Sequence, residues 1–187
     1  MTGREELHAR AVDEFGGRVE RIRPDQWDLP TPCREWTVRD LVGHLVYEQL
    51  WVPSLLAGAT IQEIGDQFEG DQLGDDPQAA WKRTSAAAVE AVAAAGDLGD
   101  FDVHLSYGST SADHYVGELT SDLVVHAWDL ARAIGADDTL DPGLVEAVLD
   151  STPPGGPGPA AIFDPPVPLP PDAGAQDRLI ALYGRQP

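Results

Sequence analysis

Asp122 and His126 lie four residues apart in the segment ELTSDLVVHAWDLARAIG, and residues four apart in an α-helix share one face. On a helical projection, His126 falls inside the apolar stripe that Leu123 and Leu130 help to form. An imidazole and a carboxylate drawn toward an apolar core need a compensating partner. Together they present nitrogen and oxygen ligands to one point, as two histidines four apart do when they hold a divalent metal ion.

Two ligands do not complete a metal site, so a third donor should come from another helix. His44 is the candidate, because it borders the apolar face of the helix predicted for residues 38–57. A set of His44, Asp122 and His126 leaves coordination positions open for water or substrate, as catalytic metal sites do. Asp129 follows His126 by three residues. It is expected to orient the His126 imidazole without binding the metal itself.

The same residues have an alternative interpretation. A buried histidine beside an aspartate is often a hydrogen-bonded core pair that holds no metal. Residue spacing by itself does not separate the two interpretations.

Other reactive side chains are interpreted without a role in the site. Cys33, in the segment PTPC, has no histidine nearby in sequence, so packing beside a helix start is a simpler interpretation than a nucleophile. Two residues share the edge of the helix that carries His44 and would line a pocket mouth or, for the tryptophan, pack in the core: Glu48 and Trp51. Three histidines are interpreted as surface residues: His8, His104 and His114. Five of the 12 basic residues are interpreted as surface ion pairs rather than as a site for a substrate carboxylate: Arg18, Arg21, Arg23, Arg34 and Arg39.

Four amphipathic helices are predicted to position the candidate ligands. Their apolar residues recur at helical spacing over residues 5–22, 38–57, 77–95 and 112–134. Thr37 followed by Asp40 is typical of a helix start, and Gly135 of a helix end. Between the second and third helices, residues 58–76 carry acidic residues and no Lys or Arg. This loop is too long for a simple antiparallel turn, so it predicts a long crossover and a parallel second and third helix.

The remainder of the chain is predicted to hold smaller elements. Residues 101–108 are compatible with either a short strand or an extended loop. A short helix is expected from Pro142 to about Leu149, and a last one between Asp172 and Tyr183. Between them, residues 153–171 contain nine prolines and predict an extended arm. The sequence thus predicts an all-α bundle over residues 1–152, with a proline-rich arm and short helix over residues 153–187 packed on the same domain.

Composition restricts the partners and the location. The 187 residues suit one globular domain, and 12 basic against 32 acidic residues give a net charge of −20. Such a charge repels phosphate backbones and anionic membrane surfaces, so neither nucleic acid nor membrane is an expected partner. The single cysteine cannot form an internal disulfide. With no long apolar run and with acids in the first ten residues, the expected location is the cytoplasm.

Two segments, QWDLPTPCREWTVRDLVGHLV and LTSDLVVHAWDLARAIG, resemble the metal-binding bundle of the mycothiol-dependent maleylpyruvate isomerase family. This family is part of the DinB-like superfamily of four-helix proteins, and the ending RLIALYGR resembles that of its single-domain relatives. The resemblance implies metal ligands at His44, Asp122 and His126. It implies a divalent ion, with zinc expected and nickel as the second choice, and a long crossover between the second and third helices.

Two departures from the family limit what the resemblance implies. The isomerase has a glutamate at the position of Asp122, and it carries a further C-terminal domain that this chain is too short to contain in full. Activity on maleylpyruvate is therefore not implied. The implied chemistry is a metal that lowers the pKa of a low-molecular-weight thiol, whose thiolate attacks an electrophilic small-molecule substrate. The expected function is a thiol-dependent transferase or isomerase, and the alternatives are a non-catalytic metal- or ligand-binding bundle with a regulatory or storage role and a purely structural bundle. The sequence also leaves a homodimer open.

Overall fold

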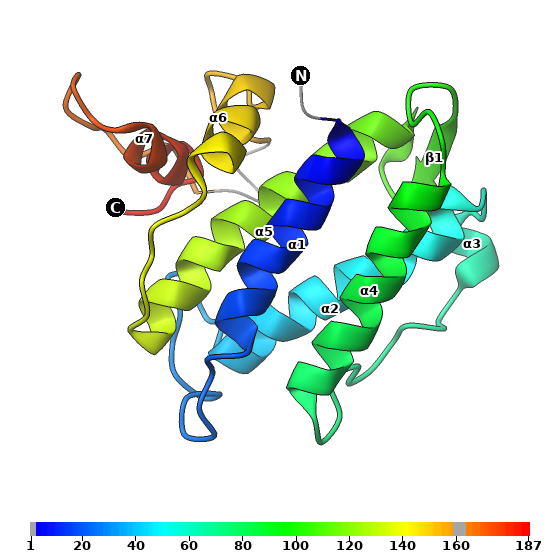
Figure 1. Cartoon of the computed structure of the whole chain (residues 1–187), viewed down its shortest axis with the longest axis horizontal. Coiled ribbons are helices and arrows are strands. Elements are labelled where there is room, and N and C mark those ends of the chain that lie inside the picture. Colours follow the sequence, from blue (N-terminus) through cyan, green and yellow to red (C-terminus); the bar gives the residue numbers. More distant parts are fainter. Residues whose placement is uncertain (1–2, 159–163) are drawn as a thin grey trace.

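The computed structural model describes residues 3–158 and 164–187 of the chain. Within them, four long helices form a bundle (Figure 1): α1 (Arg4–Val19), α2 (Val38–Leu56), α4 (Pro77–Ala94) and α5 (Ala112–Ile134). Helix α1 packs mainly on α5, and α2 packs mainly on α4. The predicted all-α four-helix bundle is confirmed. Residues 159–163 of the predicted proline-rich arm lie outside the described residues.

Helices α2 and α4 run in the same direction, as the acidic segment between them predicts. Near their starts, Arg39 of α2 donates a hydrogen bond to the carbonyl oxygen of Gly74, 3.0 Å away. Beyond their ends, Thr60 and His104 form an isolated parallel bridge. The crossover also contains a one-turn helix that the sequence analysis missed, α3 (Ile61–Ile64), which begins at Thr60 with a capping box. Helices α1 and α5 run opposite to α2 and α4, so the long crossover sets the topology of the bundle (Figure 1).

Side-chain caps fix the ends of the helices that carry the candidate ligands. Helix α2 begins at a capping box in which the Thr37 hydroxyl accepts from the Asp40 backbone N–H and the Asp40 carboxylate accepts from that of Thr37. Pro53 lies inside α2 without ending it, since the helix continues to Leu56. Helix α5 ends at Gly135, whose φ of 67° is the left-handed conformation that glycine adopts most readily. The first helix ends at Val19, three residues before its predicted end.

The open interpretation of residues 101–108 is settled as the start of a hairpin. Strands β1 (Asp102–Leu105) and β2 (Gly108–Ser111) pair antiparallel, with Val103 opposite Thr110. Val103 is fully buried in a second apolar cluster. This cluster joins the hairpin to the C-terminal end of α2 and the N-terminal end of α5. The hairpin thus covers the end of the bundle away from the start of α2.

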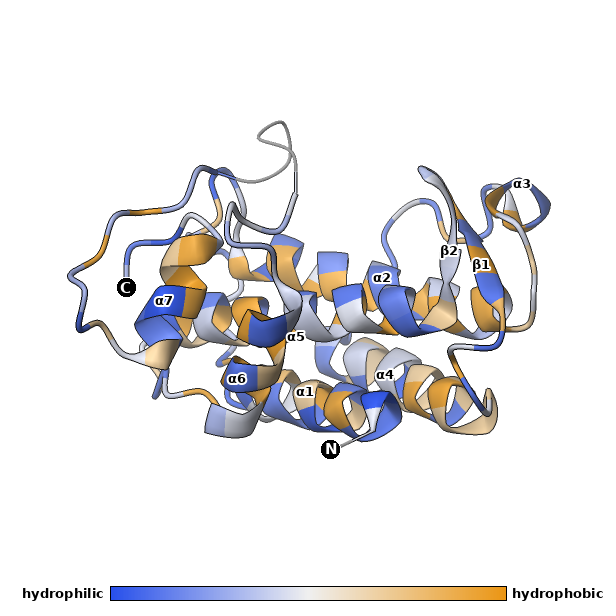
Figure 2. Cartoon of the chain, turned by 90° about the horizontal axis from the view of Figure 1, so that it is seen from above, coloured by the Kyte–Doolittle hydropathy of each residue, from blue (hydrophilic) through white to orange (hydrophobic). Residues whose placement is uncertain are grey.

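The main apolar core lies between the four helices and holds fully buried side chains such as Phe15, Leu41, Leu45, Leu123 and Leu130. Figure 2 shows apolar and polar residues alternating around each helix, which is the pattern of an amphipathic bundle. The last two helices, α6 (Pro142–Ser151) and α7 (Ala175–Leu182), pack on each other and extend this core with buried side chains that include Leu144, Leu179 and Ile180.

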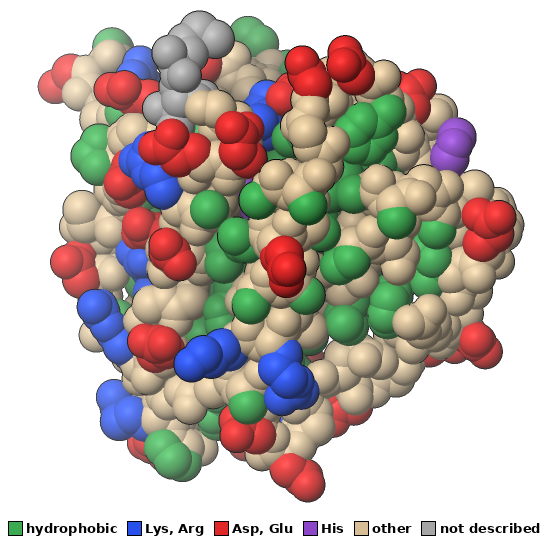
Figure 3. Space-filling view, turned by 45° about the vertical axis from the view of Figure 1, so that its right-hand side comes forward, with side chains coloured by type: hydrophobic (Ala, Val, Ile, Leu, Met, Phe, Trp, Pro, Cys, Tyr) green, Lys and Arg blue, Asp and Glu red, His purple; other side chains and the backbone are tan. Residues whose placement is uncertain are grey.

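The surface carries the excess of acidic side chains. On the face drawn in Figure 3, Asp and Glu are spread widely, whereas Lys and Arg gather on one side. None of the helices among the described residues is both long and apolar enough to cross a membrane.

Candidate metal centre

His44, Asp122 and His126 meet between α2 and α5. His44 Nε2 lies 3.0 Å from Asp122 Oδ2, and His126 Nε2 lies 3.2 Å from Asp122 Oδ1. One ligand atom from each residue lies within 4.8 Å of the others. The two imidazole rings stand nearly perpendicular, at 76°, with their centroids 5.4 Å apart. The predicted set of three residues is therefore brought together at one point, with a nitrogen, an oxygen and a nitrogen facing one another.

The spacing of these atoms suits a zinc-sized ion. Zinc binds histidine nitrogen and carboxylate oxygen at about 2.0–2.1 Å, which in a tetrahedron places neighbouring ligand atoms about 3.3 Å apart. Each histidine faces a different oxygen of Asp122 at about this spacing, with 3.0 Å from Oδ2 to His44 Nε2 and 3.2 Å from Oδ1 to His126 Nε2. The side chains of His44 and Asp122 are 28% and 32% exposed, whereas that of His126 is 8% exposed. The group is open on one side, where an exogenous ligand would approach.

The carboxylate of Asp122 and the imidazole of His126 shift each other's pKa values in the directions that favour attraction. Burial by itself would raise the pKa of Asp122, but His126 and His44 outweigh it and hold that pKa well below its usual range. Burial by itself would lower the pKa of His126, but Asp122 on one ring nitrogen and Asp129 on the other raise it well above its usual range. The metal-free site therefore pairs an ionised carboxylate with a protonated imidazole. A metal ion bound by these residues would have to replace the proton on His126 Nε2.

Asp129 lies behind His126, where the sequence analysis expects an orienting group. Its Oδ2 is 2.9 Å from His126 Nδ1, and its side chain is fully buried. Burial would raise the pKa of Asp129, but hydrogen bonds and charge from His126, together with Arg185, lower it. The carboxylate is thus ionised and accepts a hydrogen bond from the Nδ1–H of His126, which leaves Nε2 directed toward Asp122.

Two residues at this position were missed by the sequence analysis, Cys33 and Arg185. Cys33 Sγ lies 3.2 Å from Asp129 Oδ2 and 3.7 Å from His126 Nδ1. Arg185 Nη2 donates to Asp129 Oδ2 at 2.9 Å and to Cys33 Sγ at 3.3 Å. Cys33 packs against the main core, as its interpretation as a packing residue expects, and the fold in addition places it beside His126, which is distant along the chain. No sequence signal links Arg185 to α5, since they meet only through the packing of α6 and α7.

The loop before α2 delivers Cys33 and Trp36 to the site. It closes on itself through a bridge between Pro30 and Thr37 and through a hydrogen bond from the backbone N–H of Thr31 to the carbonyl oxygen of Trp36, at 3.0 Å. The Trp36 ring centroid then lies 4.9 Å from that of His44 and 5.8 Å from that of His126. The indole covers one side of both candidate ligands.

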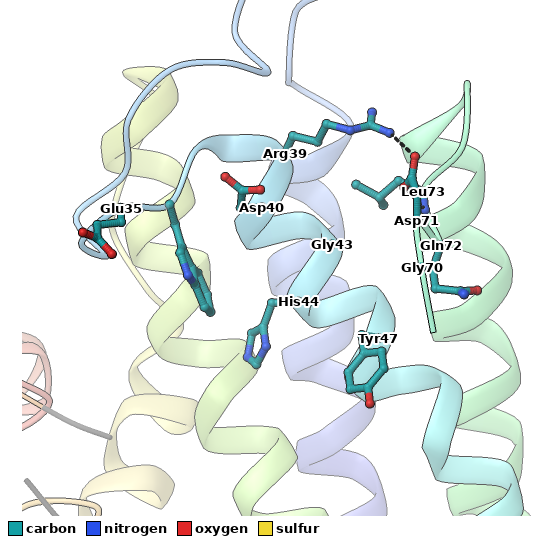
Figure 4. A pocket seen from close by; sticks show the side chains of 11 residues that line it. Glu35, Arg39, Asp40, Gly43, His44, Tyr47, Gly70, Asp71, Gln72 and Leu73 are labelled. Carbon is teal, nitrogen blue, oxygen red and sulfur yellow. Dashed lines mark hydrogen bonds and ion pairs between the residues drawn. The ribbon is translucent and has the colours of Figure 1, made fainter. Parts of the chain in front are cut away.

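A cleft of about 690 Å³ opens beside His44 (Figure 4). It lies between the start of α2 and the crossover segment, and its lining includes Trp36, His44, Tyr47 and Leu73. Figure 4 shows the His44 ring projecting from α2 and the Arg39 guanidinium bonded to Asp71 at the rim. Of the three candidate ligands, His44 is the one that lines this cleft.

The remaining predictions for single residues have mixed outcomes. Trp51 packs in the second apolar cluster rather than at a pocket mouth, and Glu48 is not among the residues that line the cleft. Burial and the charge of Asp122 nevertheless raise the pKa of Glu48. His8 is fully buried, so its interpretation as a surface residue is wrong, whereas the other two histidines are exposed: His104 and His114. Three of the five clustered arginines form ion pairs at the surface, as expected: Arg23, Arg34 and Arg39. Arg18 pairs with Glu14 but is buried, so its interpretation as a surface residue is wrong.

A four-helix bundle with a long crossover, and with candidate metal ligands converging from α2 and α5, defines a helical-bundle protein with a candidate metal centre. The sequence model of the mycothiol maleylpyruvate isomerase N-terminal domain matches residues 8–131. The chain belongs to this family.

Relatives and solved structures agree with this assignment. Two uncharacterized proteins of Mycobacterium tuberculosis, from strains CDC 1551 and H37Rv, are each 34% identical over 186 residues, which cover 95% of both chains. Two crystal structures of mycothiol-dependent maleylpyruvate isomerase share the fold, with a TM-score of 0.63 for a histidine-to-alanine variant and 0.61 for the other. Their sequence identities are 14% and 15%, and each match covers 79% of this chain. This chain spans 65% of the length of the solved isomerase.

Proposed function

We propose that the protein binds one divalent metal ion and uses it to activate a low-molecular-weight thiol. The ligands are His44 Nε2, a carboxylate oxygen of Asp122 and His126 Nε2. Zinc is the expected ion, and nickel is the second choice. The observation that carries this proposal is the convergence of one donor atom from each residue within 4.8 Å. The reaction class is transfer of the thiol to an electrophilic small molecule, or its isomerisation through a thiol adduct.

The donor set supports a catalytic rather than a structural site. Structural zinc sites use four protein ligands, whereas catalytic sites use three and keep a position for water or substrate. A metal ion at this position supplies a charge that lowers the pKa of a bound thiol, so that the thiol is held as its nucleophilic thiolate at neutral pH. The cleft beside His44 offers room for the remainder of the thiol and for the electrophile.

The family supports the choice of thiol. The matching family model and the two solved structures carry mycothiol in their names. We therefore propose a thiol of the mycothiol type as cosubstrate. The chain keeps a carboxylate at Asp122 beside two histidines, so the proposed centre retains the nitrogen and oxygen ligands that zinc accepts.

Elemental analysis of the untagged protein tests the metal site. We expect about one zinc or nickel ion per chain in the wild type and its loss in His44→Ala and His126→Ala. His114→Ala is the matched control, because His114 is exposed and pairs with Glu118, away from the three candidate ligands. Equal metal content in all four proteins would sink the ligand assignment.

A second measurement separates the enzyme from the non-catalytic alternative. The metal-loaded protein is mixed with mycothiol and a panel of electrophiles, and the loss of free thiol is followed over time. We expect thiol consumption that depends on the metal and stops in His126→Ala. A protein that binds metal but neither binds nor consumes the thiol would instead be a metal-binding bundle with a regulatory or storage role.

A further inference from the structure

A second group of metal-ligand atoms lies on the opposite side of His126. Cys33, His126 and Asp129 each offer one donor atom, and these atoms lie within 4.8 Å of one another. The two groups share a single imidazole. The first group uses its Nε2 with Asp122, and the second uses its Nδ1 with Asp129. Thiolate, imidazole and carboxylate together are ligands that zinc and cobalt accept readily.

Arg185 already occupies this second group. Its Nη2 lies 2.9 Å from Asp129 Oδ2 and 3.3 Å from Cys33 Sγ, and its Nε lies 3.3 Å from Asp129 Oδ1. The remaining nitrogen, Nη1, donates to the carbonyl oxygen of Tyr183 at 2.8 Å, which holds the guanidinium in place. The Arg185 side chain is only 15% exposed. A guanidinium does not lose its proton in a protein, so its positive charge is permanent.

A metal ion on the Nδ1 side would have to displace this charge. Like charges in a largely buried position repel more strongly than in water, since the surroundings screen them less. Both Asp129 oxygens and Cys33 Sγ already accept hydrogen bonds from Arg185, so their lone pairs are engaged. The guanidinium therefore stands where a second cation would be held.

We propose that Arg185 is a positioning residue that fills the Cys33, His126 and Asp129 group with its own charge and so confines the metal to the Nε2 side of His126. This inference rests on the proposed function, because it concerns where the proposed metal binds. With Asp129 held by Arg185, His126 Nδ1 keeps its proton and its Nε2 lone pair is directed to the metal. Removing the guanidinium frees three ligand atoms, one of them a thiol, to compete for the ion.

A purely structural role for Arg185 makes a different prediction. A buried ion pair between Arg185 and Asp129 would also attach the segment after α7 to the bundle, and its loss would lower stability. It would not change which atoms bind the metal. The two roles therefore differ in one property, namely whether the metal gains a sulfur ligand when Arg185 is replaced.

Cobalt substitution reads out that property, because a thiolate bound to Co²⁺ gives an intense near-ultraviolet charge-transfer band that nitrogen and oxygen ligands lack. The metal-free full chain is titrated with Co²⁺ in the wild type, Arg185→Gln, Arg185→Lys and the double variant Arg185→Gln with Cys33→Ser. We expect no thiolate band in the wild type and a band in Arg185→Gln. The double variant should lose this band, and Arg185→Lys, which keeps the positive charge, should suppress it.

Arg132→Gln is the matched control. Arg132 also pairs with an aspartate, Asp138, but on the exposed surface of the same bundle. We expect this variant to bind Co²⁺ like the wild type, without a thiolate band.

The outcomes distinguish this inference from the proposed function. A wild type that binds Co²⁺ without a thiolate band, together with an Arg185→Gln variant that does the same, would leave the function standing and overturn the role of Arg185. A thiolate band in the wild type would overturn it as well, even if Arg185→Gln fails to fold. If Arg185→Gln binds Co²⁺ with a thiolate band and the wild type binds no Co²⁺, the role of Arg185 is supported but the proposed centre is contradicted.

Discussion

The fully buried carboxylate of Asp129 accepts a hydrogen bond from His126 Nδ1 at 2.9 Å, across one turn of α5. This contact determines which ring nitrogen of His126 can bind a metal ion. Because Asp129 keeps a proton on Nδ1, Nε2 is the nitrogen that would give up its proton to bind a metal ion beside Asp122 and His44. The orientation of the candidate ligand is therefore built into one helix and does not depend on a metal ion to create it.

The first prediction concerns this contact. Asp129→Asn keeps the shape of the side chain but removes its charge, so it should weaken zinc binding by about 10- to 100-fold without abolishing it. The dissociation constant is measured by competition with a chromophoric chelator. Asp138→Asn, which removes an exposed carboxylate paired with Arg132, should leave the affinity unchanged. An Asp129→Asn variant with wild-type affinity would show that the contact does not tune the metal.

The helices could be predicted because their signals are local. The Thr37 capping box, the Pro at the start of α4 and the left-handed Gly135 are each encoded within a few residues. The hairpin and α3 are less visible in sequence, because β1 and β2 have four residues each and are stabilised by pairing and by the burial of Val103. Short elements depend on tertiary contacts more than on propensity.

The candidate site divides in the same way. Asp122 and His126 could be paired from helical periodicity, and His44 from its place on a second amphipathic helix. Cys33 and Arg185 could not, because they are 152 positions apart and meet only in the folded chain. His8 is predicted at the surface but is buried. A single polar residue near the start of a helix gives no sign in the sequence of whether its neighbours bury it.

The second prediction is that zinc affinity rises with pH. The pKa of His126 is raised in the metal-free protein, whereas that of Asp122 is lowered, so at neutral pH the histidine carries the proton that zinc must replace. Zinc binding should release about one proton from His126, and affinity should rise by about tenfold per pH unit until the pH exceeds that raised pKa. Calorimetry at pH 7 in buffers of different ionisation enthalpy counts the proton. Zinc binding with no proton release would contradict this account.

The third prediction concerns His8, which is fully buried in α1. Burial lowers the pKa of His8 to about 4, and the nearby Gln49, which raises it, only partly offsets this. Above pH 6.5 His8 is neutral in both folded and unfolded chains and has no effect on the pH dependence. As the pH falls from 6.5 toward 4, the unfolded chain binds the proton first, so the folded state loses stability, by about 3 kcal/mol in full.

Urea unfolding at pH 7 and pH 5 checks the prediction for His8. Between these values the wild type should lose about 2 kcal/mol of unfolding free energy more than His8→Leu, in which the titrating group is absent. The matched control is His114→Leu, since His114 is an exposed histidine of α5. This control should keep the wild-type dependence. Parallel curves for the wild type and His8→Leu would show that His8 does not titrate in this range.

The fourth prediction uses Trp36 as a reporter of the centre. Its ring centroid lies 4.9 Å from that of His44 and 5.8 Å from that of His126, so an ion between the two histidines would lie beside the indole. Binding of Co²⁺, which absorbs light and quenches nearby indoles, should lower the tryptophan fluorescence of the wild type. Trp36→Phe should lose most of this quenching while it still binds the ion. In Trp81→Phe the quenching should persist, because Trp81 packs edge-on against Phe15, with ring centroids 4.8 Å apart, on the helices α4 and α1 that carry none of the three ligands. Quenching that survives in Trp36→Phe and disappears in Trp81→Phe would place the ion elsewhere in the bundle.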